Sequence, residues 1–119
     1  MKAFNVQVHR EPHANAVVAK ISGDAGIEHI DELERHLAQL AKDAPSVIVL
    51  DLAELDYIAS LGLGALLKYR DELESHGSRL KLAALAPFIE QAIKNAWLQS
   101  AFEIHPTIAS ALNAAKPQA

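Results

Sequence analysis

The chain has 119 residues, a length that suits one domain and leaves no room for a second. Half of the residues are hydrophobic and only 5% are aromatic, so we expect a core built mainly from aliphatic side chains. The formal net charge of −4, with lysines and arginines scattered singly, argues against a nucleic-acid partner, and the absence of cysteine excludes disulfides and thiolate metal sites.

No apolar run approaches the roughly 18 residues that a membrane-spanning helix needs. The first residues also lack the basic and then apolar pattern of a signal peptide. We therefore expect a cytoplasmic protein without a membrane span.

The first part of the chain predicts a β-hairpin. Residues 4–8 alternate between apolar and polar side chains, which is typical of a strand with one exposed face. Residues 11–15 contain a proline and read as a turn. Residues 16–22 form the second predicted strand, and the glycines in residues 23–26 end it.

A helix and a buried strand follow. Residues 27–43 predict a helix because apolar side chains recur on one stripe, formed by Ile30, Leu33, Leu37, Leu40 and Ala41. The helix ends before Pro45, because proline disfavours helical dihedrals in the residue before it. Residues 47–50 are an unbroken apolar run, typical of a strand buried on both faces.

The second half of the chain alternates helices and strands. A helix is predicted from Ser60 to about residue 75, with Gly77 as its stop, and a strand with apolar residues at every second position over residues 79–83. Pro87 begins a third helix whose apolar side comprises Phe88, Ile89, Ala92, Ile93 and Ala96. Residues 98–104 are extended, and Thr107 caps a last helix.

The predicted order is β-β-α-β-α-β-α-β-α, in a single α/β domain over residues 1–114 with a frayed tail at 115–119. Strands that alternate with helices imply parallel pairing through right-handed crossovers. We therefore expect an open mixed sheet with its helices packed largely on one side.

Residues 51–67 place a lone serine between the buried strand and the long helix. Ser60 is expected at the N-cap of that helix, where its hydroxyl can accept a hydrogen bond from a first-turn amide. Gly62 and Gly64 leave the backbone bare beside it, and a helix N-terminus favours an anion. Leu61 and Ala65 are predicted on the outer face, either as an apolar collar for a docking partner or as scattered surface residues.

The element order and this central stretch resemble the STAS domain, the family of bacterial anti-sigma factor antagonists. The resemblance covers nearly the whole chain. Its pieces are residues 17–24, 47–52, 57–67 and 77–82, together with Leu98 and residues 102–104.

In that family the loop before the helix commonly reads aspartate, serine, serine or threonine, glycine, and the serine two before the glycine is phosphorylated. Alignment on Gly62 puts this acceptor at Ser60. Ala59 and Leu61 replace the aspartate and the second hydroxyl residue, and Gly26 stands where the family often has another aspartate.

The resemblance implies a regulatory partner switch. The unphosphorylated protein would bind an anti-sigma factor that is also a serine kinase and so free the sigma factor. Phosphorylation of Ser60 would break the complex, and a phosphatase would reset it. The predicted partner-binding residues are Asp24, Asp56, Tyr57, Ala59, Leu61, Gly62, Gly64 and Ala65.

Other polar and aromatic residues have structural interpretations. Ser60 itself could be a plain N-cap, and we expect Asp24 and Asp51 to form turns or cap strand ends, with Asp56 as a rim contact. Trp97 is expected in the core or at its rim. The histidines show no helical i, i+4 pair typical of a zinc site and are expected to be solvated; they are His9, His13, His29, His36, His76 and His105.

We expect no catalysis, no cofactor and no metal. Ser60 lacks the preceding glycine of a nucleophile elbow, and no phosphate-binding Gly-rich motif with lysine is present. Two alternatives to a phosphorylation switch stay open: a non-switching STAS subunit of a transporter or signalling complex, and a domain that binds a small ligand or nucleotide.

Overall fold

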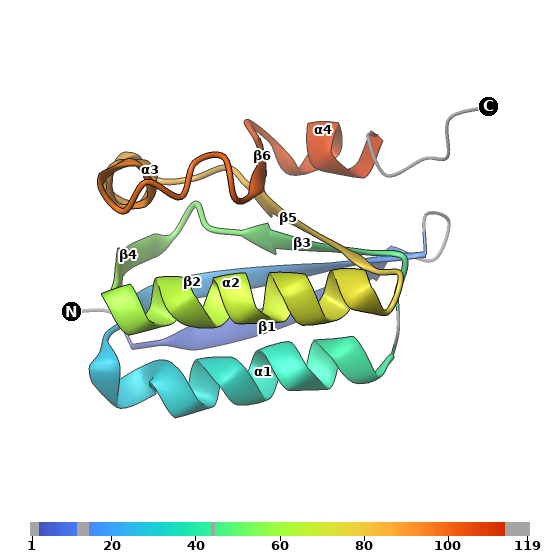
Figure 1. Ribbon diagram of the computed structural model, residues 1–119, viewed down its shortest axis with the longest axis horizontal. Coiled ribbons are helices and arrows are strands. Elements are labelled where there is room, and N and C mark those ends of the chain that lie inside the picture. The colour runs from blue at the N-terminus through green and yellow to red at the C-terminus, as the bar shows by residue number, and fades with distance from the viewer. Residues whose placement is uncertain (1–2, 12–14, 44, 114–119) are drawn as a thin grey trace.

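One open sheet organises the protein, and a computed structural model describes it over residues 3–11, 15–43 and 45–113 (Figure 1). Its strands are β1 (Asn5–Glu11), β2 (Ala16–Ala25), β3 (Val47–Asp51), β4 (Leu55–Ile58), β5 (Arg79–Ala83) and β6 (Glu103–His105). The helices are the short 3-10 helix η2 (Ile27–His29), α1 (Ile30–Lys42), α2 (Ser60–Ser75), α3 (Pro87–Asn95) and α4 (Ile108–Asn113).

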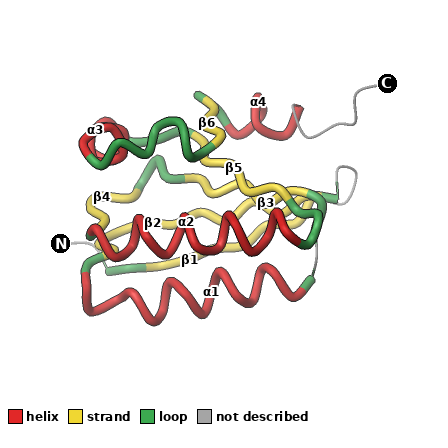
Figure 2. The backbone as a smooth tube through the Cα atoms, in the orientation of Figure 1, coloured by secondary structure: helices red, strands yellow, loops and turns green. Residues whose placement is uncertain are grey.

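The sheet is mixed, as the sequence predicts. Its strand order is β1-β2-β3-β5-β6, and β4 pairs with β2 off this path. Only the opening hairpin of β1 and β2 is antiparallel; β2 with β3, β3 with β5, and β5 with β6 are parallel pairs. Parallel neighbours require crossover helices, and Figure 2 shows the helices flanking the strands.

Most of the helices share one face of the sheet. Buried residues of α1, α2 and α3, such as Leu33, Leu66 and Ile89, join one apolar cluster with Leu50 and Leu82 of the sheet. The cluster on the other face is smaller, and α4 covers it through Ala111. Because both faces are covered, β3 needs an apolar residue at nearly every position, which explains the run at residues 47–50.

The element boundaries differ from the prediction in a few places. Strand β2 continues to Ala25, and β4 was not predicted at all: the sequence was read as a loop between the buried strand and Ser60. In β4 only Leu55 and Ile58 are buried, so the strand lacks a period-two pattern. The predicted turn at residues 11–15 and the frayed tail at 115–119 fall wholly or partly outside the described residues.

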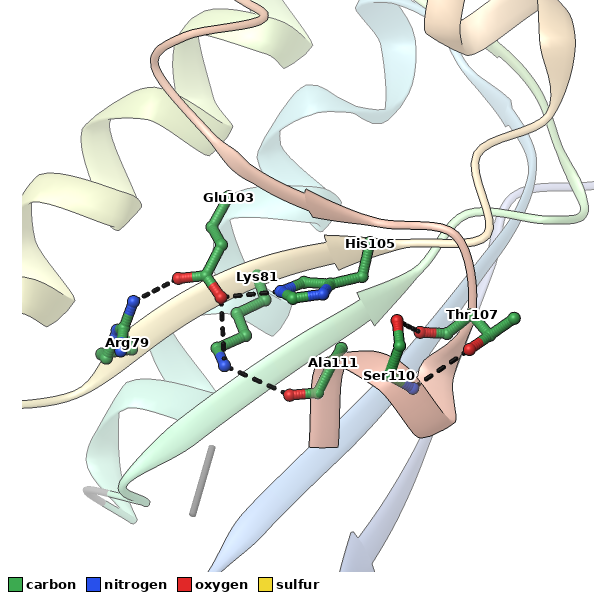
Figure 3. Close-up of polar contacts among 7 residues, drawn as sticks. All are labelled: Arg79, Lys81, Glu103, His105, Thr107, Ser110 and Ala111. Atoms are coloured by element: carbon green, nitrogen blue, oxygen red, sulfur yellow. Dashed lines mark hydrogen bonds and ion pairs between the residues drawn. The ribbon is translucent and has the colours of Figure 1, made fainter. Parts of the chain in front are cut away.

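A buried lysine on β5 ties α4 to the sheet (Figure 3). The alternating pattern of residues 79–83 suggests a solvated Lys81, yet the side chain of Lys81 is 0% exposed. Its Nζ atom lies 3.1 Å from Glu103 Oε2 and donates a hydrogen bond to the Ala111 carbonyl oxygen at 3.1 Å. A buried ammonium is costly unless it is paired and hydrogen-bonded, and both conditions are met here.

Glu103 is the centre of this network. It also pairs with Arg79, and its Oε2 atom lies 2.7 Å from His105 Nε2. Burial alone would raise the pKa of Glu103, but the hydrogen bonds from His105 and Lys81, with the charges of Lys81 and Arg79, hold its pKa below the ordinary value of 4.5. The predicted Thr107 cap of α4 is confirmed beside it, because the Ser110 amide donates to Thr107 Oγ1 at 3.0 Å.

The network predicts that substitutions at Glu103 and at Lys81 lower the free energy of unfolding by different amounts. Glu103→Gln leaves the Lys81 ammonium buried without its carboxylate and should lower the free energy of unfolding by about 3 kcal/mol. Lys81→Met fills the same space without a charge and should cost less than about 1 kcal/mol. Urea unfolding of the two variants measures the difference, and equal losses would contradict the account.

The pKa of Glu103 also predicts an acid-sensitive contribution to stability. Because its folded-state pKa is depressed, the network stabilises the fold fully above the unfolded value and loses this effect as the pH falls through the folded value. The unfolding midpoint of the wild type should therefore fall more between about pH 6 and about pH 3 than that of Lys81→Met/Glu103→Gln. Parallel pH profiles would show that Glu103 contributes nothing.

Candidate functional site

Strand β4 delivers Ser60 to one end of the sheet. Residues 23–25 of β2 pair in parallel with β4, with Ala25 opposite Ile58. The Ala59 amide then donates to the Ala25 carbonyl at 3.0 Å, and the chain turns into α2. Ser60 is thus fixed by the last hydrogen bonds of the sheet at the first residue of the helix.

The N-cap of α2 is Ala59, so the prediction that Ser60 caps the helix is wrong by one residue. Ala59 is extended, with φ −73° and ψ 157°, because it still pairs with β2. Its carbonyl oxygen accepts hydrogen bonds from the amides of Gly62 at 2.8 Å and Leu63 at 3.1 Å. Alanine has no side-chain acceptor, so no side chain caps this helix.

The first turn of α2 is therefore an uncapped positive end. It contains no acidic residue, and Ser60 is exposed on it. The first amides of a helix have no intrahelical partner, and the helix dipole places partial positive charge there. An oxygen anion attached to Ser60 would lie at the end of the helix that favours negative charge.

The two glycines beside Ser60 have different roles. A Cβ atom on Gly62 would lie 2.7 Å from Ile58 Cγ1, so this glycine lets α2 approach β4. A Cβ atom on Gly64 would meet nothing within 4 Å, because Gly64 faces open space. Gly62 is buried and therefore structural, whereas Gly64 contributes to the exposed surface near Ser60.

The predicted apolar collar is half right. Leu61 is 62% exposed, as expected, but Ala65 is only 5% exposed. Helix α1 packs along α2, and Lys68, on the same flank as Ala65, pairs with Glu34 of α1 at 3.4 Å. The neighbouring helix widens the buried face of α2, and this packing could not be seen from the α2 sequence alone.

Aromatic residues extend the exposed surface beyond Leu61. Tyr57 of β4 is 44% exposed, and its ring lies 6.4 Å from that of Phe88 in α3, which is 60% exposed. Phe88 was assigned to the inner side of its helix, and this prediction is wrong because Ile89 and Ile93 alone are buried in α3. Ile27, the second residue after β2, is also exposed, which the sequence does not predict.

The remaining predicted residues divide between surface and interior. Asp56 is exposed, Ala59 is buried, and Asp24 is half-buried. Asp24 Oδ1 has no hydrogen-bond partner among the described residues, so the turn-forming role expected for it is not seen at this atom. Asp51 does form the expected turn, since its Oδ1 atom accepts a hydrogen bond from the Ala53 amide at 3.1 Å.

Trp97 lies outside the core. It was expected in the core or at its rim, but it is 85% exposed, just after the end of α3. Nothing in the pattern of residues 87–98 distinguishes this position from the neighbouring apolar ones.

Away from Ser60, an open groove of about 320 Å³ runs between the C-terminal halves of α1 and α2; its lining includes Ala38, Tyr69, Leu73 and His76. Over the described residues, no group of three or more histidine, aspartate or glutamate side chains could hold a metal ion. The chemically distinctive surface is therefore the one around Ser60, where an exposed hydroxyl, the N-terminus of α2 and the exposed rings of Tyr57 and Phe88 occur.

Comparison with known proteins identifies the family. The family model of the STAS domain matches residues 5–111. The protein belongs to this family, and its single α/β domain with a mixed sheet is the STAS fold.

Two relatives have names that indicate a class of protein. A candidate anti-sigma factor antagonist, BtrV of Bordetella bronchiseptica, is 28% identical over 88 residues, covering 74% of this chain and 76% of the relative. An anti-sigma factor antagonist from Mycobacterium paratuberculosis superposes with a TM-score of 0.86 at 23% identity, over 97% of this chain and 96% of that one.

The fold of the anti-sigma factor antagonist SpoIIAA in its unphosphorylated form is also similar, with a TM-score of 0.74 and 21% identity over 94% of this chain and 95% of that one. At these identities the structural likeness shows the shared fold. Among the described residues, no helix is long and apolar enough to cross a membrane.

The glycine geometry predicts opposite effects of two similar substitutions. Gly62→Ala forces a methyl group against Ile58 and should lower the free energy of unfolding by about 1–3 kcal/mol. Gly64→Ala adds a methyl group in open space within a helix and should raise it by about 0.5–1 kcal/mol. Urea unfolding compares the pair, and destabilisation by both substitutions would contradict the packing described here.

Proposed function

We propose that the protein is an anti-sigma factor antagonist that acts by binding and not by catalysis. In its unmodified form it binds an anti-sigma factor that is also a serine kinase, and this releases a sigma factor. The kinase phosphorylates Ser60, the complex dissociates, and a phosphatase restores the binding form. The single observation that carries the proposal is an exposed serine on an uncapped helix N-terminus, beside exposed apolar side chains.

The named relatives support the class of partner. The mycobacterial protein is named as an anti-sigma factor antagonist and BtrV as a candidate one, and the present chain covers most of each. A SpoIIAA structure in the phosphorylated form also resembles this chain, with a TM-score of 0.68 at 18% identity. These names favour the regulatory interpretation over a static subunit of a transporter.

The local electrostatics explain how one modification would break the complex and keep the fold. A phosphoserine adds about −1.5 to −2 charges at neutral pH. At the N-terminus of α2 this charge is favourable for the helix. At a docked interface the same charge would have to lose its water beside Leu61 and Tyr57, with the exposed carboxylate of Asp56 nearby in the chain, and both effects oppose binding.

Two substitutions at Ser60 test the switch. Ser60→Ala should keep wild-type affinity for the purified anti-sigma kinase encoded nearest to this gene and should remain bound in the presence of ATP. Ser60→Asp should weaken binding at least about tenfold, because it places a fixed charge in the interface. Isothermal titration calorimetry measures both affinities.

A charge-matched control separates location from net charge. Gln39→Glu adds one negative charge on the exposed side of α1 and should leave the affinity unchanged. Thermal unfolding should show Ser60→Asp to be as stable as the wild type or more stable. Unchanged affinity in both Ser60 variants would refute the switch.

Phosphorylation itself has a direct readout. Incubation of the wild type with ATP and the same kinase should add one phosphate, and intact-mass and peptide spectra should place it on Ser60. Ser60→Ala should gain none. A phosphate on any other residue, or ATP-dependent dissociation without phosphate transfer, would contradict the mechanism.

A further inference from the structure

Trp97 has an unusual backbone for its size. Its φ angle is 61°, in the left-handed region, and its side chain is 85% exposed. The other described non-glycine residues with positive φ are Asn15 and Ala84, both small. A Cβ atom in the left-handed region crowds the following carbonyl group, so a bulky residue there is uncommon.

The turn that requires this backbone does not use the indole. The Trp97 amide donates to the Lys94 carbonyl oxygen, and the Leu98 amide donates to that of Ile93, both at 3.0 Å. These two bonds form the helix C-terminal motif in which glycine is usual at the left-handed position. Leu98, the next residue, provides the apolar contact with the core, so the fold is satisfied without the Trp97 side chain.

The same motif occurs in this chain with the usual residue. At the end of α2, Gly77 has φ 88°, its amide donates to the Glu74 carbonyl oxygen at 3.2 Å, and the Ser78 amide donates to that of Leu73 at 3.0 Å. Helices α2 and α3 thus end in the same way, with glycine in one case and tryptophan in the other. The turn after α3 does not need the indole of Trp97, and its left-handed backbone disfavours a large side chain at this position.

The position of α3 connects Trp97 to the Ser60 surface. Helix α3 lies against β4 at the end of the molecule where α2 begins (Figure 1), and the Phe88 ring contacts that of Tyr57. Helix α3 has nine residues and is about 14 Å long at 1.5 Å per residue, with Phe88 near its start and Trp97 two residues after its end. This distance fits within a standard protein interface, which buries about 800 Å² on each partner.

We propose that Trp97 is a binding determinant for the anti-sigma factor partner, its indole inserting into an apolar pocket of that protein. This inference rests on the proposed function and adds the outer end of α3 to the surface that contains Ser60. Glu90 of α3 is paired with Lys94, so the exposed acid Asp56 and the net charge of −4 are what favour a pocket with a basic rim. Exposed tryptophans are among the residues that most often dominate binding energies.

The test separates binding from folding because glycine suits this backbone. Trp97→Gly should leave the melting temperature unchanged or raise it by up to about 5 °C. It should weaken binding to the purified anti-sigma kinase encoded nearest to this gene by at least about tenfold in calorimetry. Val8→Thr alters another exposed apolar residue, on the edge strand β1, and should leave both quantities unchanged.

Trp97 is the sole tryptophan of the chain, so fluorinated tryptophan places one fluorine NMR signal at this position. That signal should shift when the partner is added. A lower melting temperature for Trp97→Gly would mean that the indole stabilises the fold and would overturn the inference. So would wild-type affinity in this variant, or a complex that forms without moving the signal; the proposed function would survive both results.

The remaining outcomes are also decisive. If the wild type fails to bind the kinase, the proposed function fails and the inference fails with it. If the wild type self-associates in sedimentation and Trp97→Gly does not, the indole contacts a second copy and the inference is overturned.

Discussion

The pairing of β4 with the end of β2 is the constraint on which the site depends. Ala25 opposite Ile58, and the Ala59 amide on the Ala25 carbonyl, fix where the chain leaves the sheet. Gly62 then allows α2 to approach Ile58 closely. These contacts place Ser60 at the first residue of α2, and the first turn of that helix contains no acidic residue. Tyr57 lies in the same strand β4, and its exposed ring contacts that of Phe88.

The sequence predicts the fold well because its apolar patterns are local. The apolar stripe of α1 indicates one buried face, and the unbroken apolar run of β3 indicates a strand that is buried on both faces. A chain in which strands and helices alternate can form a sheet in few topologies. The same local pattern places the start of the long helix within one residue of its observed position at Ser60. The family resemblance then supplied the functional interpretation, which the pattern alone did not contain.

Three of the failures share a cause, because each depends on an element distant in the sequence. Ala65 lies on the flank of α2 whose Lys68 pairs with α1, and Lys81 is covered by α4. Phe88 is a local exception, since Ile89 and Ile93 of its own helix occupy the interior. Strand β4 has no period of its own and exists through its pairing with β2. Trp97 differs from these residues, because it is an apolar residue that lies outside the core, in a turn with left-handed backbone.

The last helix covers an apolar strip of the sheet as well as Lys81. Without α4 the ammonium would lose the Ala111 carbonyl oxygen, and the apolar strip around Val49 and Ala83 would meet water. A gene fusion or a shortened version of the domain that stops after β6 would therefore leave these apolar residues exposed, whereas the Lys81 ammonium would gain water in place of the lost carbonyl oxygen. An evolutionary loss of α4 would thus favour polar replacements at Val49 and Ala83, while Lys81 would suit the new surface unchanged.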